Sequence, residues 1–147
     1  MIEFLLAGIP LLFLMLAIVQ LSLLWAGKSA VDTAAHLAAR KFARVARDDF
    51  PKAREMAFLE AFQVCRNRPG GSLGSAAMTA LDVTKGGGQG ANRADAGESL
   101  CVRLTHGVEL VVPWIDRVLF ALFPGRKIRL GDHYYLMMQS ARWVTVE

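Results

Sequence analysis

The sequence predicts an α+β fold, in which a long N-terminal transmembrane helix continues into a small extracytoplasmic domain with a second helix and a small antiparallel sheet. Three features predict this fold: an uncharged apolar block at the N-terminus, a helical repeat of small apolar residues after it, and two strand-like segments near the C-terminus. We divide the chain into residues 1–27 (transmembrane helix), 28–64 (extramembrane helical region), 65–98 (Gly-rich variable region) and 99–147 (strand–helix–strand region).

The N-terminal block has no charged side chain between Phe4 and Gly27. As a helix it spans roughly 36 Å, which exceeds the ~30 Å hydrocarbon layer of a bilayer. Trp25 and Lys28 stand at its far end, where interfacial aromatic and basic side chains are expected, and Pro10 predicts a kink. A cleaved signal peptide is the alternative, but the apolar run is longer than the ~7–15 residues usual for such peptides.

The helix is expected to continue to about residue 45, because small and apolar residues recur there at helical spacing: Val31, Ala34, Ala35, Ala38, Phe42 and Val45. Asp49 and Pro51 mark the start of a second helix. We expect Met56, Phe58, Leu59 and Phe62 to form its apolar face. The glycine-rich stretch that follows, and the later GGGQG segment, predict loops.

In the C-terminal region, apolar residues from Leu100 to Val112 alternate with polar ones, which predicts a half-buried strand. Pro113 ends it, residues 114–123 form a short helix that is apolar nearly all round, and residues 133–147 form a final strand antiparallel to the first. Four large side chains of the short helix have two interpretations, core packing or contact with a partner or membrane: Trp114, Leu119, Phe120 and Phe123.

The two cysteines, Cys65 and Cys101, predict one disulfide in an oxidising compartment. The bridge would close a loop of about 37 residues and stabilise the protein by roughly 4 kcal/mol in the chain-entropy model. Two reduced cysteines in a cytosolic protein remain the alternative.

No motif indicates catalysis, so we expect a protein that is not an enzyme. The histidines and cysteines match no metal-ligand spacing, and we expect no metal, no cofactor and no small-molecule substrate. The net charge of +4 suits anionic lipid headgroups better than a nucleic-acid groove, so we expect a membrane and no nucleic acid as partner.

The N-terminal region resembles TadE-like proteins, the minor pilins or pseudopilins of tight-adherence pilus systems. The resemblance rests on the acidic-aromatic pair Glu3-Phe4, the early Pro10, and the pairs Ala34-Ala35 and Ala39-Arg40 in the following helix. It implies a structural or assembly component of a tight-adherence type IV pilus, a single-pass protein of the bacterial inner membrane with its C-terminal domain in the periplasm.

The same resemblance implies that Glu3 is an assembly carboxylate, that other pilins and assembly proteins are partners, and that a prepilin peptidase removes a leader. Only Met1-Ile2 precedes Glu3, so we expect either a leader upstream of Met1 or no processing. Two alternatives stay open. The basic residues that follow the span would place the domain in the cytoplasm by the positive-inside rule, and the helix could merely anchor a periplasmic binding or scaffold domain of a secretion system.

Overall fold

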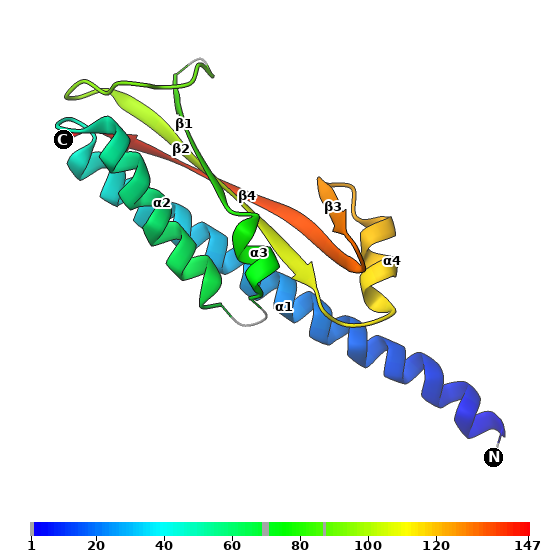
Figure 1. The fold of residues 1–147 in the computed structure, drawn as a ribbon. Helices are drawn as coiled ribbons and strands as arrows, with labels where there is room; N and C mark the ends of the chain where they lie inside the picture. Colours follow the sequence, from blue (N-terminus) through cyan, green and yellow to red (C-terminus); the bar gives the residue numbers. More distant parts are fainter. Residues whose placement is uncertain (1, 69–70, 87) are drawn as a thin grey trace.

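The computed structural model describes residues 2–68, 71–86 and 88–147, and the side chains of the first helix from Ala7 onward. The elements are α1 (Ile2–Val45), α2 (Phe50–Arg66), α3 (Leu73–Ala77), β1 (Ala80–Lys85), β2 (Ser99–Leu110), α4 (Ile115–Leu122), β3 (Lys127–Leu130) and β4 (His133–Thr145). The second half of α1 and all of α2 lie against one face of a four-stranded antiparallel sheet (Figure 1), which confirms the predicted α+β layout.

Alanines bring α1 and α2 close together. Ala53, Ala57 and Ala61 recur every fourth residue on α2 and are fully buried. They pack with Ala34, Ala35 and Ala38 of α1 in one core cluster. Small side chains at i, i+4 spacing let helix axes approach closely. The prediction that Leu59 belongs to the buried face of α2 was wrong, because the close approach selects the alanine stripe and leaves Leu59 half exposed.

The start of α2 follows from local chemistry. Asp49 is its N-cap, and the carboxylate accepts a hydrogen bond from the backbone N–H of Lys52 at 3.0 Å. Pro51 sits in the first turn, where a missing N–H costs nothing. The predicted helix start is confirmed.

The sheet has the strand order β1-β2-β4-β3. The predicted antiparallel pair is β2 with β4, in a register that places Leu104 opposite Ser140. Alternation sends Leu100, Val102 and Leu104 of β2 toward the helices, where they are fully buried. β3 was not predicted. It is a short edge strand of four exposed residues that joins β4 through a tight turn with Gly131 at a φ of 62°.

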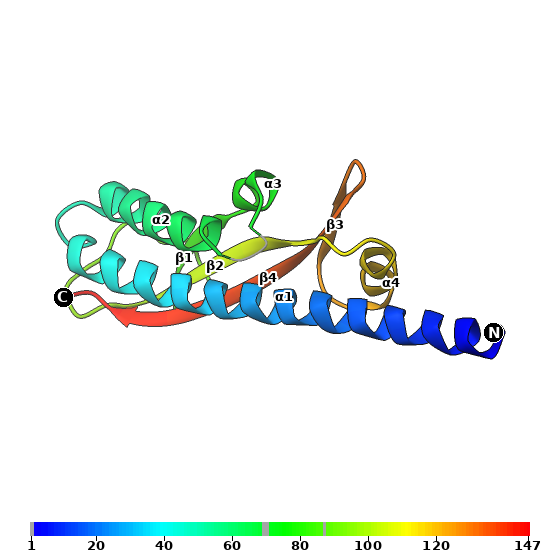
Figure 2. The ribbon, with the colours of Figure 1, turned by 90° about the horizontal axis from the view of Figure 1, so that it is seen from below.

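The first half of α1 extends beyond the sheet. Seen from below (Figure 2), α4 and the segment that leads into it from β2 lie beside this half, and the chain termini are at opposite ends of the molecule. The molecule is therefore a domain built around the second half of a helix whose first half projects from it.

Candidate functional site: the junction of the projecting helix and the domain

The projecting half of α1 exposes large apolar side chains, among them Ile9, Leu12, Leu14, Ile18 and Val19. Among the described residues, the helical stretch Ala7–Val45 contains a window long and apolar enough to cross a membrane, and only 11% of that window is buried. A core helix of a soluble protein would be mostly buried, so the exposure favours a lipid or protein environment for this half.

Gln20 ties the helix to the domain. It is fully buried, and its Oε1 accepts hydrogen bonds from the backbone N–H groups of Val111, at 3.1 Å, and Val112, at 2.8 Å. These amides lie just past the end of β2, where the ladder no longer pairs them. The one strongly polar side chain of the apolar segment thus satisfies the strand end.

About two helical turns after Gln20, α1 crosses β2 at close range. A Cβ on Gly27 would lie 3.0 Å from both methyl groups of Val108. Lys28 follows, and its ammonium donates to the Asp32 carboxylate at 3.0 Å and to the Gln139 carbonyl of β4 at 2.9 Å. The sheet therefore meets α1 within the apolar segment, from Gln20 onward.

A buried polar network lies behind this contact. Arg68 Nε donates to His106 Nε2 at 3.3 Å, and Arg68 Nη2 donates to Ser75 Oγ at 2.9 Å. The other imidazole nitrogen of His106, Nδ1, lies 2.8 Å from Thr79 Oγ1. Burial first, and then the Arg68 charge, lower the pKa of His106 to about 4. His106 is therefore neutral at physiological pH, with Nδ1–H donating to Thr79.

The same network brings a serine and a histidine together, because Ser75 Oγ is 3.1 Å from His106 Nε2. The serine hydroxyl, however, donates to the Gly107 carbonyl, and the Nε2 lone pair accepts from Arg68. Both side chains are almost completely buried. Because the His106 lone pair is already occupied and the Ser75 proton is bonded elsewhere, the two side chains do not form an activated nucleophile–base pair. Their hydrogen bonds instead hold α3 against β2.

The short helix α4 has two apolar faces. Its inner face includes Ile115, which is 1% exposed, and Phe120, whose ring lies 4.8 Å from that of Tyr134. Its outer face carries Trp114, Val118 and Leu122, four residues apart and 77%, 41% and 74% exposed. Of the four predicted contact residues, Trp114 is exposed, while Leu119, Phe120 and Phe123 are partly buried. The outer positions Val118 and Leu122 were missed, although their spacing from Trp114 would have revealed them.

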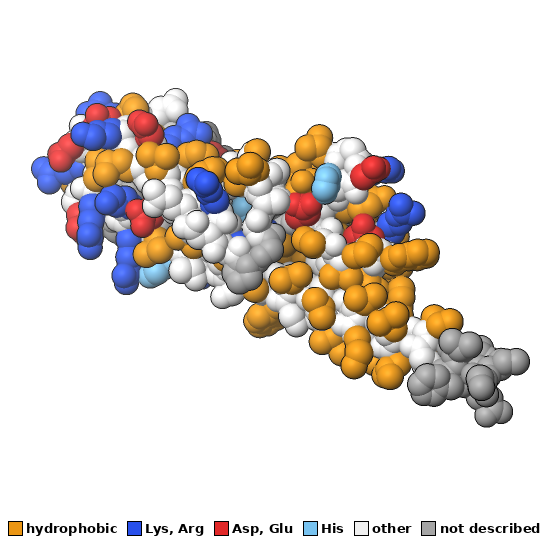
Figure 3. All heavy atoms as spheres, turned by 60° about the horizontal axis from the view of Figure 1, so that its bottom comes forward, with side chains coloured by type: hydrophobic (Ala, Val, Ile, Leu, Met, Phe, Trp, Pro, Cys, Tyr) orange, Lys and Arg blue, Asp and Glu red, His pale blue; other side chains and the backbone are white. Residues whose placement is uncertain are grey.

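Exposed apolar side chains continue from α4 onto the projecting half of α1. In Figure 3 they cover most of this end of the molecule, with a few charged side chains along one side, whereas most charged side chains gather at the opposite end of the domain. The junction is therefore the apolar pole of a molecule with a charged opposite pole.

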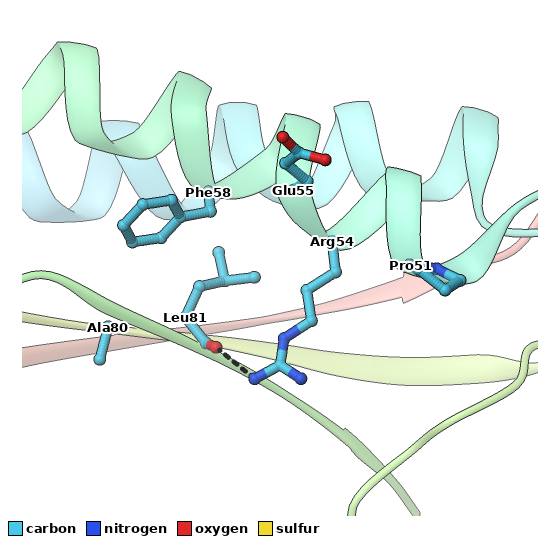
Figure 4. A pocket seen from close by; sticks show the side chains of 6 residues that line it. All are labelled: Pro51, Arg54, Glu55, Phe58, Ala80 and Leu81. Atoms are coloured by element: carbon cyan, nitrogen blue, oxygen red, sulfur yellow. Dashed lines mark hydrogen bonds between the residues drawn. The ribbon is translucent and has the colours of Figure 1, made fainter.

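A shallow pocket lies away from the junction, between α2 and the edge strand β1 (Figure 4). Pro51, Arg54, Glu55, Phe58, Ala80 and Leu81 line it. Arg54 Nη2 donates to the Leu81 carbonyl at 3.4 Å, which occupies an acceptor of the open sheet edge. Within the described residues, no group of three or more His, Cys, Asp or Glu side chains could hold a metal ion.

The predicted disulfide was wrong, because Cys65 and Cys101 are both free buried thiols. Cys65 lies in the core with Leu100 and Val102 of β2. Cys101 sits between these two residues in the strand, so alternation directs it to the opposite face of the sheet. Burial raises the pKa of Cys65 to about 11, against a smaller opposing effect of Arg68.

The other predicted residues all lie on α1. Pro10 is inside the helix, which continues on both sides of it. Trp25 is exposed and borders a hollow together with Lys28 and Arg142. Glu3 belongs to α1, and its side chain lies outside the described part of the chain.

The fold and the junction together define a class of protein. Its one N-terminal apolar helix fits a single-pass membrane protein, and the second half of that helix carries a small α+β domain. Residues 1–40 match the family of TadE-like proteins, which confirms the resemblance inferred from the sequence. The match covers the projecting half of α1 and most of its docked half, and supports a component associated with the tight-adherence pilus system. No curated protein and no solved structure matches the chain.

Proposed function

We propose that the protein is a minor pilin-like structural component of a tight-adherence type IV pilus and acts through helix packing and subunit association, without catalysis. The observation that carries the proposal is the projecting half of α1, which is apolar and exposed and belongs to the segment that matches TadE-like proteins. A helix built in this way can lie in lipid before assembly and pack against the helices of other subunits afterwards.

In this proposal α1 crosses the bacterial inner membrane, and the domain stands in the periplasm. Glu3 is the assembly carboxylate near the start of the helix, and a prepilin peptidase is the processing enzyme. The distribution of charge supports the membrane crossing by α1, since the charged end of the domain is the end farthest from the apolar half of α1 (Figure 3).

Site-specific photocrosslinking in cells tests the proposal. A photoreactive amino acid at Leu14, an exposed position of the projecting helix, should form crosslinks to other pilins. The same amino acid at the exposed Leu73 of α3 is the control and should not. Crosslinks from Leu14 to lipid alone would instead identify α1 as a simple anchor for a periplasmic binding or scaffold domain.

Orientation needs its own measurement. A protease added to spheroplasts should degrade the domain of the intact chain, because the proposal places the domain in the periplasm. Protection in spheroplasts, with cleavage only after lysis, would place the domain in the cytoplasm, as the positive-inside rule predicts, and would contradict the proposal.

A further inference from the structure

The hydrogen bonds of Gln20 fix how far the domain stands from the membrane. The uncharged segment begins at Phe4, and Gln20 binds the domain through Val111 and Val112. The helix between Phe4 and Gln20 is about 24 Å long at about 1.5 Å per residue, which is less than the ~30 Å hydrocarbon layer. If α1 spans the layer, the parts of the domain beside Gln20 reach the lipid boundary.

The part of the domain at this level is apolar on its outside. Val111 follows β2, and Trp114, Val118 and Leu122 form the outer stripe of α4 beside the projecting helix (Figure 2). A stripe of large apolar side chains is costly to leave in water, and here it is continuous with the exposed apolar surface of α1 (Figure 3).

The backbone at Trp114 holds this indole outward. Trp114 precedes α4 with a φ of 72°, the one positive value at a non-glycine residue in the described chain. Such a conformation costs about 1–3 kcal/mol for a residue with a side chain. Tryptophan is also the side chain that prefers the boundary between headgroups and acyl chains.

Basic side chains outnumber acidic ones in the segment that carries the stripe. Between residues 111 and 131 the chain has Arg117, Arg126, Lys127 and Arg129 but only one acidic residue, Asp116. Lys127 Nζ donates to the carbonyls of Phe120, Ala121 and Phe123, so it satisfies the C-terminal end of α4 without water. Arg117 and Arg126 are exposed, and Arg117 lies beside Trp114 and Val118, so anionic headgroups would attract it there.

We infer that α4 is a second membrane contact, with Trp114, Val118 and Leu122 resting in the boundary between headgroups and acyl chains of the bilayer that α1 crosses. The inference rests on the proposed membrane anchoring by α1. The domain is then held at two places, by the helix that spans the bilayer and by a short helix that lies on it.

Depth-dependent fluorescence quenching tests the contact. The full-length protein is placed at one copy per nanodisc of phosphatidylethanolamine and phosphatidylglycerol, with lipids brominated at a shallow acyl position to probe the boundary and, in a second preparation, at a deep position to probe the span. Each variant keeps one tryptophan, and phenylalanine replaces the other native ones: Trp114 is kept in the first variant, Trp143 in the control, and Leu14→Trp alone reports the span in the third. Trp143 is 65% exposed and pairs with Cys101 at the far end of β2, about 30 Å along the strand from α4.

Quenching of Trp114 several-fold stronger than that of Trp143, with the Leu14→Trp reporter also quenched, is the expected result. Equal quenching of Trp114 and Trp143, with the reporter quenched, overturns the contact by α4 and leaves the anchoring by α1 intact. In that case a neighbouring subunit becomes the candidate that covers the stripe. An unquenched reporter would overturn the anchoring itself and this inference with it.

Discussion

Arg68 and His106 are joined by a hydrogen bond of 3.3 Å in the interior of the domain, from the guanidinium Nε to the imidazole Nε2. They are 38 residues apart: Arg68 lies just after the end of α2, and His106 lies in the middle of β2. The bond fixes His106 as a neutral acceptor, so the domain is built to exclude the histidinium ion.

Stability should therefore fall as the pH is lowered. The folded protein holds the pKa of His106 near 4, from an ordinary value of about 6.5, chiefly through burial. Between these two pH values His106 is protonated in the unfolded chain and neutral in the folded chain. The contribution of neutral His106 to the free energy of unfolding is therefore fully present above pH 6.5. It is lost as the pH falls toward 4, which lowers the free energy of unfolding by up to about 3 kcal/mol. Denaturant titrations of the detergent-solubilised protein at a series of pH values measure the effect.

The matched variant is His106→Gln, which keeps a hydrogen-bonding side chain but cannot titrate. It should lower stability at pH 7 and flatten the dependence between pH 6.5 and 4 relative to the wild-type protein. An unchanged slope would mean that other groups cause the pH dependence.

Replacement of Gln20 by leucine should loosen the junction. Gln20→Leu leaves the N–H groups of Val111 and Val112 without their acceptor, at a cost of about 1–3 kcal/mol for the buried Val112 amide and less for the part-buried Val111 amide. Hydrogen exchange should accelerate at these two amides while the centre of β2 stays protected. Ser22→Ala is the control, because this exposed hydroxyl bonds only to the Ile18 carbonyl of its own helix. Equal exchange in both variants would contradict the anchoring role of Gln20.

Two glycines of α1 should respond in opposite directions to alanine. Gly27→Ala places a methyl group 3.0 Å from Val108, a fully buried and β-branched residue with little freedom to move. We expect a loss of about 1–3 kcal/mol, which exceeds the gain in helix propensity. Gly8→Ala meets no atom within 4 Å among the described residues and should gain up to about 1 kcal/mol from helix propensity. Thermal unfolding in detergent compares the two, and a stabilised Gly27→Ala would show that the contact with Val108 is loose.

The cysteines should react as two slow, separate thiols. Both are buried, and the raised pKa of Cys65, about 11, leaves little thiolate at neutral pH. Alkylation should be slow in the native protein and should add two labels per chain after unfolding without reductant. Mass spectrometry counts the labels. A chain that takes up no label until reductant is added would contain the bridge that the structure lacks.

The sequence predicted those elements whose signal lies within a few neighbouring residues. The continuous α1 follows from its apolar run and its alanine repeat. The start of α2 follows from Asp49 and Pro51, and β2 follows from strict alternation. The edge strand β3 carries no such signal, because four exposed residues have no buried face to reveal a period.

The junction could not be predicted because its partners are distant in sequence and partly backbone. Gln20 binds backbone amides that follow it by 91 and 92 residues. Backbone N–H groups are present at nearly every residue, so no residue type in the sequence indicates which of them Gln20 binds. The buried face of α2 was misjudged for a related reason. Large apolar residues such as Leu59 suggest a core, but the distance between two helices decides whether alanine or leucine fits it.

The two faces of α4 give the sharpest test of its role, because a charge can be placed on either one. Ile115→Asp puts a carboxylate at a position that is 1% exposed, and should unfold the domain or cost several kcal/mol. Leu122→Asp puts the same charge at a position that is 74% exposed, and should change stability in detergent by no more than about 0.5 kcal/mol. Repulsion from anionic headgroups should nevertheless lift α4 from the bilayer in Leu122→Asp and reduce the quenching of Trp114 by brominated lipids. A Leu122→Asp protein that is folded and quenched like the wild type would show that this face of α4 does not lie in lipid.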